Sequence, residues 1–103
     1  MTSNQPSLTG KQARYLRGLG HSLKPLLQLG KGGITDPFVK QVARALETHE
    51  LIKIKLIRNA PDSLIDASEE LAARIPCQIA QKIGKTLLLY RPREEDPEIV
   101  LPS

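Results

Sequence analysis

The segment from residue 25 to residue 57 reads PLLQLGKGGITDPFVKQVARALETHELIKIKLI, and its pattern decides the fold. The short apolar run Pro25–Leu29 predicts a strand, and a glycine-rich loop follows it. Asp36 and Pro37 are typical of an N-cap and the first position of a helix, which is expected to run to about His49. The predicted buried stripe of this helix consists of Val39, Val42, Ala43 and Leu46.

The end of the same segment alternates between apolar and basic residues. Ile52, Ile54 and Leu56 are expected on one face of a half-buried strand. Lys53 and Lys55 are expected on the other face. A strand, a helix and a second strand in this order predict two parallel strands joined by a right-handed crossover.

A further helix is predicted before this segment, from about Thr9 to Leu19. Gly18 and Gly20 are expected to end it, because glycine weakens a helix. Its predicted apolar stripe is Leu16, Leu19 and Leu23. Another face carries Arg14, Arg17 and His21. Residues 1–7 are polar, and they are predicted to form a disordered lead.

After the segment, a third helix is predicted over residues 62–74, followed by strands at 77–83 and 86–91. Gly84 and Lys85 form a predicted two-residue hairpin turn with glycine first, as in a type II′ turn. Residues 93–103 are acidic and contain proline, and we predict a tail that does not pack. The fold class is therefore α/β (α+β), with three helices and a four-stranded mixed sheet in the order αβαβαββ, forming one domain over residues 8–92.

Charge is distributed unevenly along the chain. Residues 1–58 hold ten Lys and Arg against three Asp and Glu, a net charge of +7. Residues 59–103 hold five against eight, a net charge of −3. This asymmetry indicates a polyanionic partner for the basic part, although a solvated lysine-rich surface would give the same pattern. No apolar run predicts a signal peptide or a membrane span, and one cysteine excludes an internal disulfide.

The glycine loop Gly30-Lys31-Gly32-Gly33 is the most informative motif. The spacing of a Walker nucleotide loop is absent, and so is that of a dinucleotide-binding loop. The remaining readings are a plain tight turn and a Gly-x-x-Gly clamp on a nucleic-acid backbone. Basic residues elsewhere favour the clamp: Arg14, Arg17, Lys24, Lys40, Arg44, Lys53, Lys55 and Arg58. His21 is either a further RNA contact or a cap for the helix that it ends.

Several separated motifs resemble the CRM domain family, named for chloroplast RNA splicing and ribosome maturation. They are residues 19–25 (LGHSLKP), residues 29–35 (LGKGGIT), residues 45–55 (ALETHELIKIK) and residues 81–91 (QKIGKTLLLYR). The resemblance covers about residues 8–92, and the single-domain form is similar to bacterial YhbY-like members. It implies an RNA-binding domain whose Gly-x-x-Gly loop helps to contact RNA. It also implies a fold like the C-terminal domain of translation initiation factor three.

For the bacterial members the resemblance implies association with precursors of the large ribosomal subunit. The expected partners are therefore RNA, above all ribosomal RNA, together with ribosomal proteins, and the expected molecule is a cytoplasmic monomer without membrane contact. The alternative is a protein-interaction module that docks on a ribonucleoprotein component through the third helix. No nucleophile–base pair or ligand cluster is evident, so we expect no enzyme activity, cofactor or metal.

Overall fold

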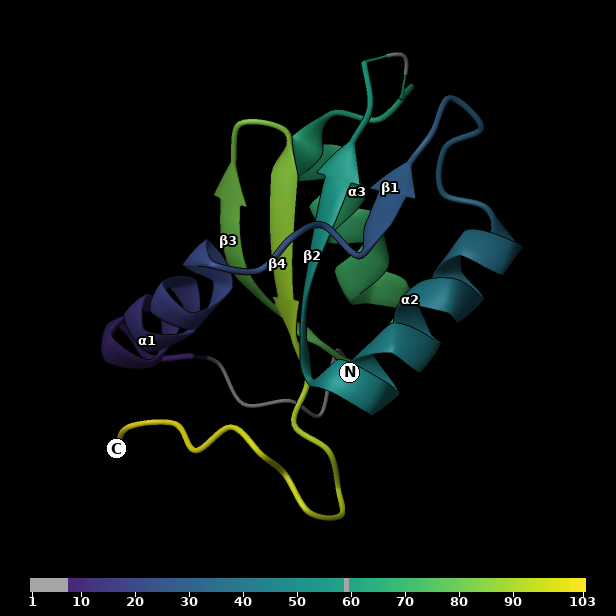
Figure 1. Cartoon of the computed structure of the whole chain (residues 1–103). Helices are drawn as coiled ribbons and strands as arrows, with labels where there is room; N and C mark the ends of the chain where they lie inside the picture. The colour runs from purple at the N-terminus through teal and green to yellow at the C-terminus, as the bar shows by residue number, and fades with distance from the viewer. Residues whose placement is uncertain (1–7, 59) are drawn as a thin grey trace.

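Three helices surround one four-stranded sheet in the computed structural model, which describes residues 8–58 and 60–103 (Figure 1). The helices are α1 (Gly10–His21), α2 (Asp36–His49) and α3 (Leu64–Arg74). The strands are β1 (Leu27–Leu29), β2 (Leu51–Leu56), β3 (Gln78–Ile83) and β4 (Thr86–Tyr90). The predicted order αβαβαββ is confirmed. The predicted disordered lead, residues 1–7, lies outside the described residues, and the implied likeness to the initiation factor domain stays a prediction.

The sheet is mixed, with the strand order β1-β2-β4-β3. β1 and β2 are parallel, while β4 runs antiparallel to both β2 and β3. Both predicted pairings are therefore confirmed. The hairpin between β3 and β4 turns at Gly84, whose φ of +59° is the positive value that a type II′ turn needs at this position.

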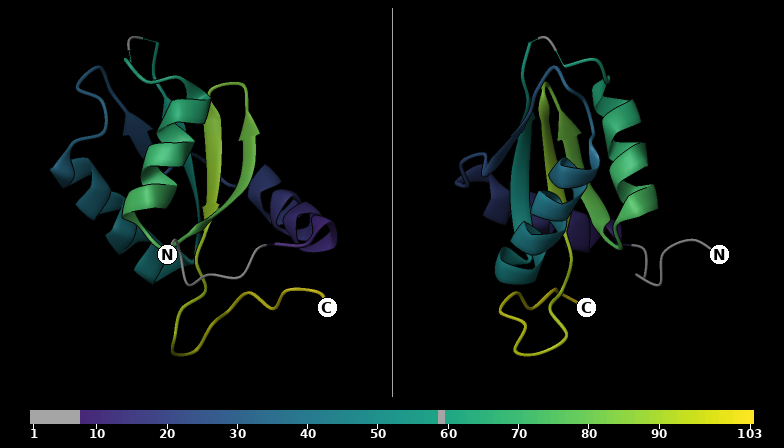
Figure 2. Two further views of the ribbon diagram at one scale, coloured as in Figure 1. Left: turned by 180° about the vertical axis from the view of Figure 1, so that it is seen from behind. Right: turned by 90° about the vertical axis from the view of Figure 1, so that its right-hand side faces the viewer.

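The two faces of the sheet support two separate apolar clusters. The larger cluster includes Ile52 and Ile54 of β2 and packs against α2 and α3. The smaller cluster lies on the other face, where Leu51 and Leu88 pack against Leu16 of α1. In the view from behind, α3 lies in front of the sheet and α1 lies to one side of it (Figure 2). The alternation of β2 explains this division, because successive side chains point to opposite faces.

Helix α1 runs two residues beyond its predicted end, to His21. The expectation that Gly18 and Gly20 end the helix is wrong. Gly20 is buried within it, and a Cβ atom at Gly20 would lie only 2.7 Å from each terminal methyl carbon of Leu88. Glycine therefore stands here because the helix backbone approaches the sheet too closely for a side chain.

The start of α2 also differs from the prediction by one position. Thr35, not Asp36, is the N-cap, and its Oγ1 accepts a hydrogen bond from the backbone N–H of Phe38 at 3.2 Å. Asp36 instead occupies the first turn, where the positive end of the helix dipole stabilises its negative charge. Either residue type can cap a helix, so the sequence pattern did not separate the two positions.

Glu50, which ends α2, is a buried carboxylate with three backbone partners. Its Oε2 accepts from the N–H of Arg93 at 2.8 Å, and its Oε1 accepts from those of Glu98 at 2.8 Å and Ile99 at 3.0 Å. Burial by itself would raise the pKa of this carboxyl, but the three donors and the charge of Arg93 outweigh it and hold the pKa below its usual value. A carboxylate thus anchors the C-terminal segment.

The prediction that residues 93–103 do not pack is wrong. Besides the bonds to Glu50, Ile99 and Leu101 pack against the smaller apolar cluster. The Nε2 of Gln12 in α1 donates to the carbonyl of Pro102 at 3.1 Å. An acidic, proline-containing composition is typical of unpacked tails. Here this tendency is outweighed by contacts with residues far away in the sequence, such as Gln12 and Glu50.

Candidate nucleic-acid interface

The glycine loop, residues 30–33, connects the carboxyl end of β1 to α2 as a tight turn. The N–H of Gly33 donates to the carbonyl of Gly30 at 3.1 Å. Lys31 and Gly32 at the tip are exposed. The turn therefore offers exposed backbone and one mobile cation directly before the N-terminus of α2, where unpaired helix N–H groups favour anions.

Gly33 is the position in this loop that requires glycine. Its φ is +75°, and an added Cβ would lie 3.1 Å from Cγ of Pro61 and 3.3 Å from Oδ2 of Asp62. Gly32 has an ordinary φ and open space around it. The glycine at 33 therefore serves both the turn and the contact with the segment that follows β2.

Arg58 lies at the same edge of the sheet as the glycine loop. β1 and β2 are parallel, so their carboxyl ends meet at one edge, and the N–H of Ile57 donates to the carbonyl of Leu29 at 3.0 Å. Beyond it, the N–H of Ala60 donates to the carbonyl of Ile57 at 3.0 Å. The exposed Arg58 stands between these two backbone contacts.

Lys85 also lies at this edge, and it was not among the site residues predicted from the sequence. The N–H of Leu56 donates to the carbonyl of Lys85 at 2.7 Å, which ties the hairpin turn to the end of β2. The sequence pattern predicts the hairpin turn but not the pairing of β4 with β2. This pairing places the turn at the edge where β2 ends. We call Gly30–Gly33, Arg58 and Lys85 together the loop edge.

The other predicted basic residues lie outside the loop edge. Lys40 and Arg44 are exposed one turn apart on α2, which begins just after the glycine loop. Six predicted residues belong to α1, the link that follows it, and the face of β2 on the α1 side: Arg14, Arg17, His21, Lys24, Lys53 and Lys55. Figure 1 shows α1 at the opposite corner of the sheet from the glycine loop. The structure therefore divides the predicted residues into separate groups.

None of the predicted cations among residues 8–58 and 60–103 takes part in an ion pair. The ion pairs there use Arg74, with Asp36 and Glu70, and Arg93, with Glu98. A cation without an acidic partner can pair with an external anion without first giving up an internal ion pair. The described residues of the loop edge thus form no ion pair of their own, and the nearby carboxylate is that of Asp62, which lies against Gly33.

The described part of the chain presents no metal site, no membrane-spanning helix and no reactive thiol. No group of three His, Cys, Asp or Glu side chains there could hold a metal ion. No helix there has the length and apolar character to cross a bilayer. Cys77 is buried, and burial raises the pKa of its thiol to about 11, so the thiol stays protonated at neutral pH.

Comparison with known proteins gives consistent matches over most of the chain. The sequence profile of the CRS1 / YhbY (CRM) domain matches residues 8–91. "Probable RNA-binding protein YqeI" of Bacillus subtilis is 44% identical, covering 92% of this chain and 99% of its own. An "RNA-binding protein" of Haemophilus influenzae is 40% identical, covering 86% and 90%. The solution structure of a hypothetical Staphylococcus aureus protein has a TM-score of 0.75 at 41% identity, covering 92% and 99%.

Proposed function

The chain belongs to the CRS1/YhbY (CRM) domain family, and from this membership we propose that it binds structured RNA through the loop edge. The observation that carries the proposal is the exposed glycine turn, which stands between the unpaired cation Arg58 and the N-terminus of α2. Backbone N–H groups and a mobile lysine suit a phosphate oxygen. The names of bacterial relatives, which describe RNA-binding proteins, support RNA as the polyanion.

The basic residues outside the loop edge have a secondary role in this proposal. Lys40 and Arg44 extend the contact along α2, and the group near α1 meets a second stretch of the same RNA. Such contacts add affinity without sequence preference, because each neutralises phosphate charge. The RNA that we propose is ribosomal RNA in a precursor of the large subunit, on the basis of the similarity to bacterial YhbY-like members.

Affinity for RNA should fall steeply as the salt concentration rises from roughly 50 to 200 mM, because phosphate contacts release condensed counterions. Fluorescence anisotropy with a labelled RNA hairpin, repeated across this range, measures the slope of log affinity against log salt. A nearly flat plot would contradict binding through phosphate contacts.

A second candidate function is docking on a protein of a ribonucleoprotein through α3. Ile65 of this helix is 58% exposed beside the exposed carboxylates Asp66 and Glu69, which is a surface that a basic protein would fit. The salt experiment separates the two functions. A protein that ignores RNA at low salt but binds a ribosomal protein would favour this candidate.

In cells, the protein should co-sediment with large-subunit precursors rather than with translating ribosomes. Loss of the gene should then cause those precursors to accumulate, since an assembly factor acts before the subunit is complete. Sucrose-gradient profiles of parent and deletion strains, probed for the protein, test both points. A normal ribosome profile with the protein at the top of a low-salt gradient would remove the assembly role and leave RNA binding intact.

A further inference from the structure

Asp36 is an acidic residue next to the glycine turn, where the proposed phosphate contact lies. It is the first residue of α2, and its side chain is 81% exposed. The other acids among residues 1–58 are Glu47, toward the opposite end of α2, and Glu50, which is buried. Asp36 is therefore the acid of this basic segment that stands where RNA is expected to bind.

The N-terminus of α2 has few hydrogen-bond donors for two anions to share. Pro37 has no N–H, and the N–H of Phe38 already donates to Oγ1 of Thr35 at 3.2 Å. A carboxylate and a phosphate both favour the remaining donors and the positive dipole of a helix N-terminus. An Asp36 side chain that turned toward these donors would therefore compete with an RNA phosphate.

Arg74 at the end of α3 holds the Asp36 side chain through an ion pair. Its Nη2 contacts Oδ1 of Asp36, and its Nη1 donates to Oε2 of Glu70 at 3.3 Å. Glu70 lies one turn earlier on the same helix, so this second bond orients the guanidinium. Both terminal nitrogens of Arg74 are thus occupied by carboxylates, and a phosphate would have to displace one of them to reach Arg74 directly.

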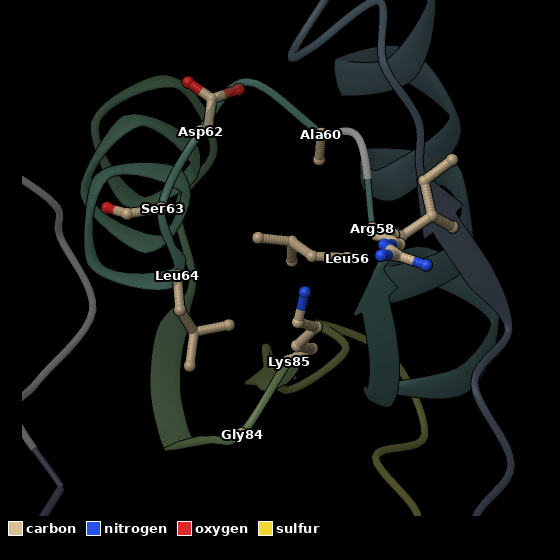
Figure 3. A pocket seen from close by; sticks show the side chains of 9 residues that line it. Leu56, Arg58, Ala60, Asp62, Ser63, Leu64, Gly84 and Lys85 are labelled. Carbon is tan, nitrogen blue, oxygen red and sulfur yellow. The ribbon is translucent and has the colours of Figure 1, made fainter.

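Asp62 is a second carboxylate near the glycine loop, and its contacts differ from those of Asp36. Its Oδ2 lies 3.3 Å from the Cβ that a side chain at Gly33 would have. Figure 3 shows this carboxylate directed away from the space between Leu56 and Lys85. Among the residues that the structure describes, the ion pairs do not include Asp62. Two acids therefore flank the loop, and Arg74 holds one of them.

We propose that Arg74 is a positioning residue for RNA binding, which holds the Asp36 carboxylate toward α3 and keeps it from the donors at the N-terminus of α2. The inference rests on the proposed function and adds to it a residue from outside the loop edge. Arg74 acts through Asp36 and makes no contact with RNA itself. Its removal frees an anion beside the phosphate, which should weaken binding roughly two- to fivefold at low salt.

A double-mutant cycle on the full chain tests this role, with the affinity for a labelled RNA hairpin measured by fluorescence anisotropy at low salt. Arg74→Gln should show the two- to fivefold loss. Asp36→Asn should bind at least as tightly as the parent, and adding Arg74→Gln to it should cost no further affinity, because no carboxylate is left to hold. Arg74→Lys keeps a cation for Asp36 and should retain most of the affinity.

Asp62→Asn is the matched control, because it removes the acid near the loop that Arg74 does not hold. Arg74→Gln should weaken binding by the same factor in the Asp62→Asn background as in the parent. Thermal melting of every variant shows whether it is folded under the binding conditions. Exposed ion pairs add little to stability, so all of these variants should be folded.

The outcomes separate the role of Arg74 from RNA binding itself. A loss in Arg74→Gln that is equally large in the Asp36→Asn background would mean that Arg74 meets RNA directly, and it would overturn the positioning role. Rescue by Asp62→Asn as well would assign the effect to net charge. Normal affinity of folded Arg74→Gln would leave the ion pair as a tie between two helices. A parent protein that binds no RNA at low salt would overturn the proposed function and this inference with it.

Discussion

Replacing Glu50 with glutamine is expected to lower the free energy of unfolding by about 2–3 kcal/mol at neutral pH, the order of a hydrogen bond to a charged group. The amide keeps the shape of the side chain but turns an N–H toward at least one of the backbone donors that the carboxylate accepts from. Urea denaturation followed by circular dichroism measures the change. Glu47→Gln, at an exposed position of the same helix, is the control and should leave stability unchanged.

The stabilising effect of Glu50 is expected to depend on pH. The pKa of Glu50 is lower in the folded protein than its usual value of 4.5. The carboxylate therefore contributes stability that is fully present above about pH 4.5 and is lost as the pH falls through the folded pKa. The difference between parent and Glu50→Gln should accordingly hold from neutral pH to about pH 4.5 and shrink as the pH falls further, toward about pH 3. A constant difference over this range would show that the carboxylate charge is not what anchors the segment.

Lys31→Glu is expected to weaken RNA binding by about 1–2 kcal/mol, because it removes a charge-assisted hydrogen bond and adds repulsion. This corresponds to a roughly five- to thirtyfold loss of affinity at 25 °C. Lys31 is exposed at the tip of the glycine turn, so its replacement should leave the melting temperature nearly unchanged. Anisotropy at low salt, with thermal melting of the same sample, measures both quantities.

The control for this charge reversal is Glu69→Lys, at an exposed position of α3. It should leave RNA affinity unchanged or slightly raised, because it adds a cation to the acidic helix. A folded Lys31→Glu protein with normal affinity, together with loss of binding on charge reversal at Lys53 and Lys55, would move the site. The contact would then be the sheet face on the α1 side, and the glycine loop would be a turn only.

Local patterns were sufficient for most of the elements. The alternation of β2 fixed both of its faces, and the Gly84–Lys85 turn fixed the last hairpin, because each signal is contained in a few neighbouring residues. Contacts between distant residues accounted for the errors at Gly20 and in residues 93–103. Gly20 stays helical because it faces Leu88, and nothing near Gly20 in the sequence indicates this contact.

The residues of the candidate site divide in the same way, into those that local patterns predict and those that depend on distant contacts. The glycine loop and Arg58 could be predicted, since both end strands that the pattern makes parallel neighbours. Lys85 could not, because its place at the loop edge depends on β4 entering the sheet beside β2. The role of Glu50 was equally hidden. Its donors, Arg93, Glu98 and Ile99, belong to a segment whose composition predicts no packing.

The division of the apolar interior into two clusters has a consequence for cooperative unfolding. Helix α1 and the C-terminal segment share the smaller cluster and are joined by the bond from Gln12 to Pro102. Neither contributes a residue to the larger cluster, which holds α2, α3 and the glycine loop's strand together. Opening of this unit would leave the larger cluster closed, but it would break the three bonds that Glu50, at the end of α2, accepts from the C-terminal segment. Local opening is therefore expected in α1 and the C-terminal segment before it is expected in the part that bears the loop edge.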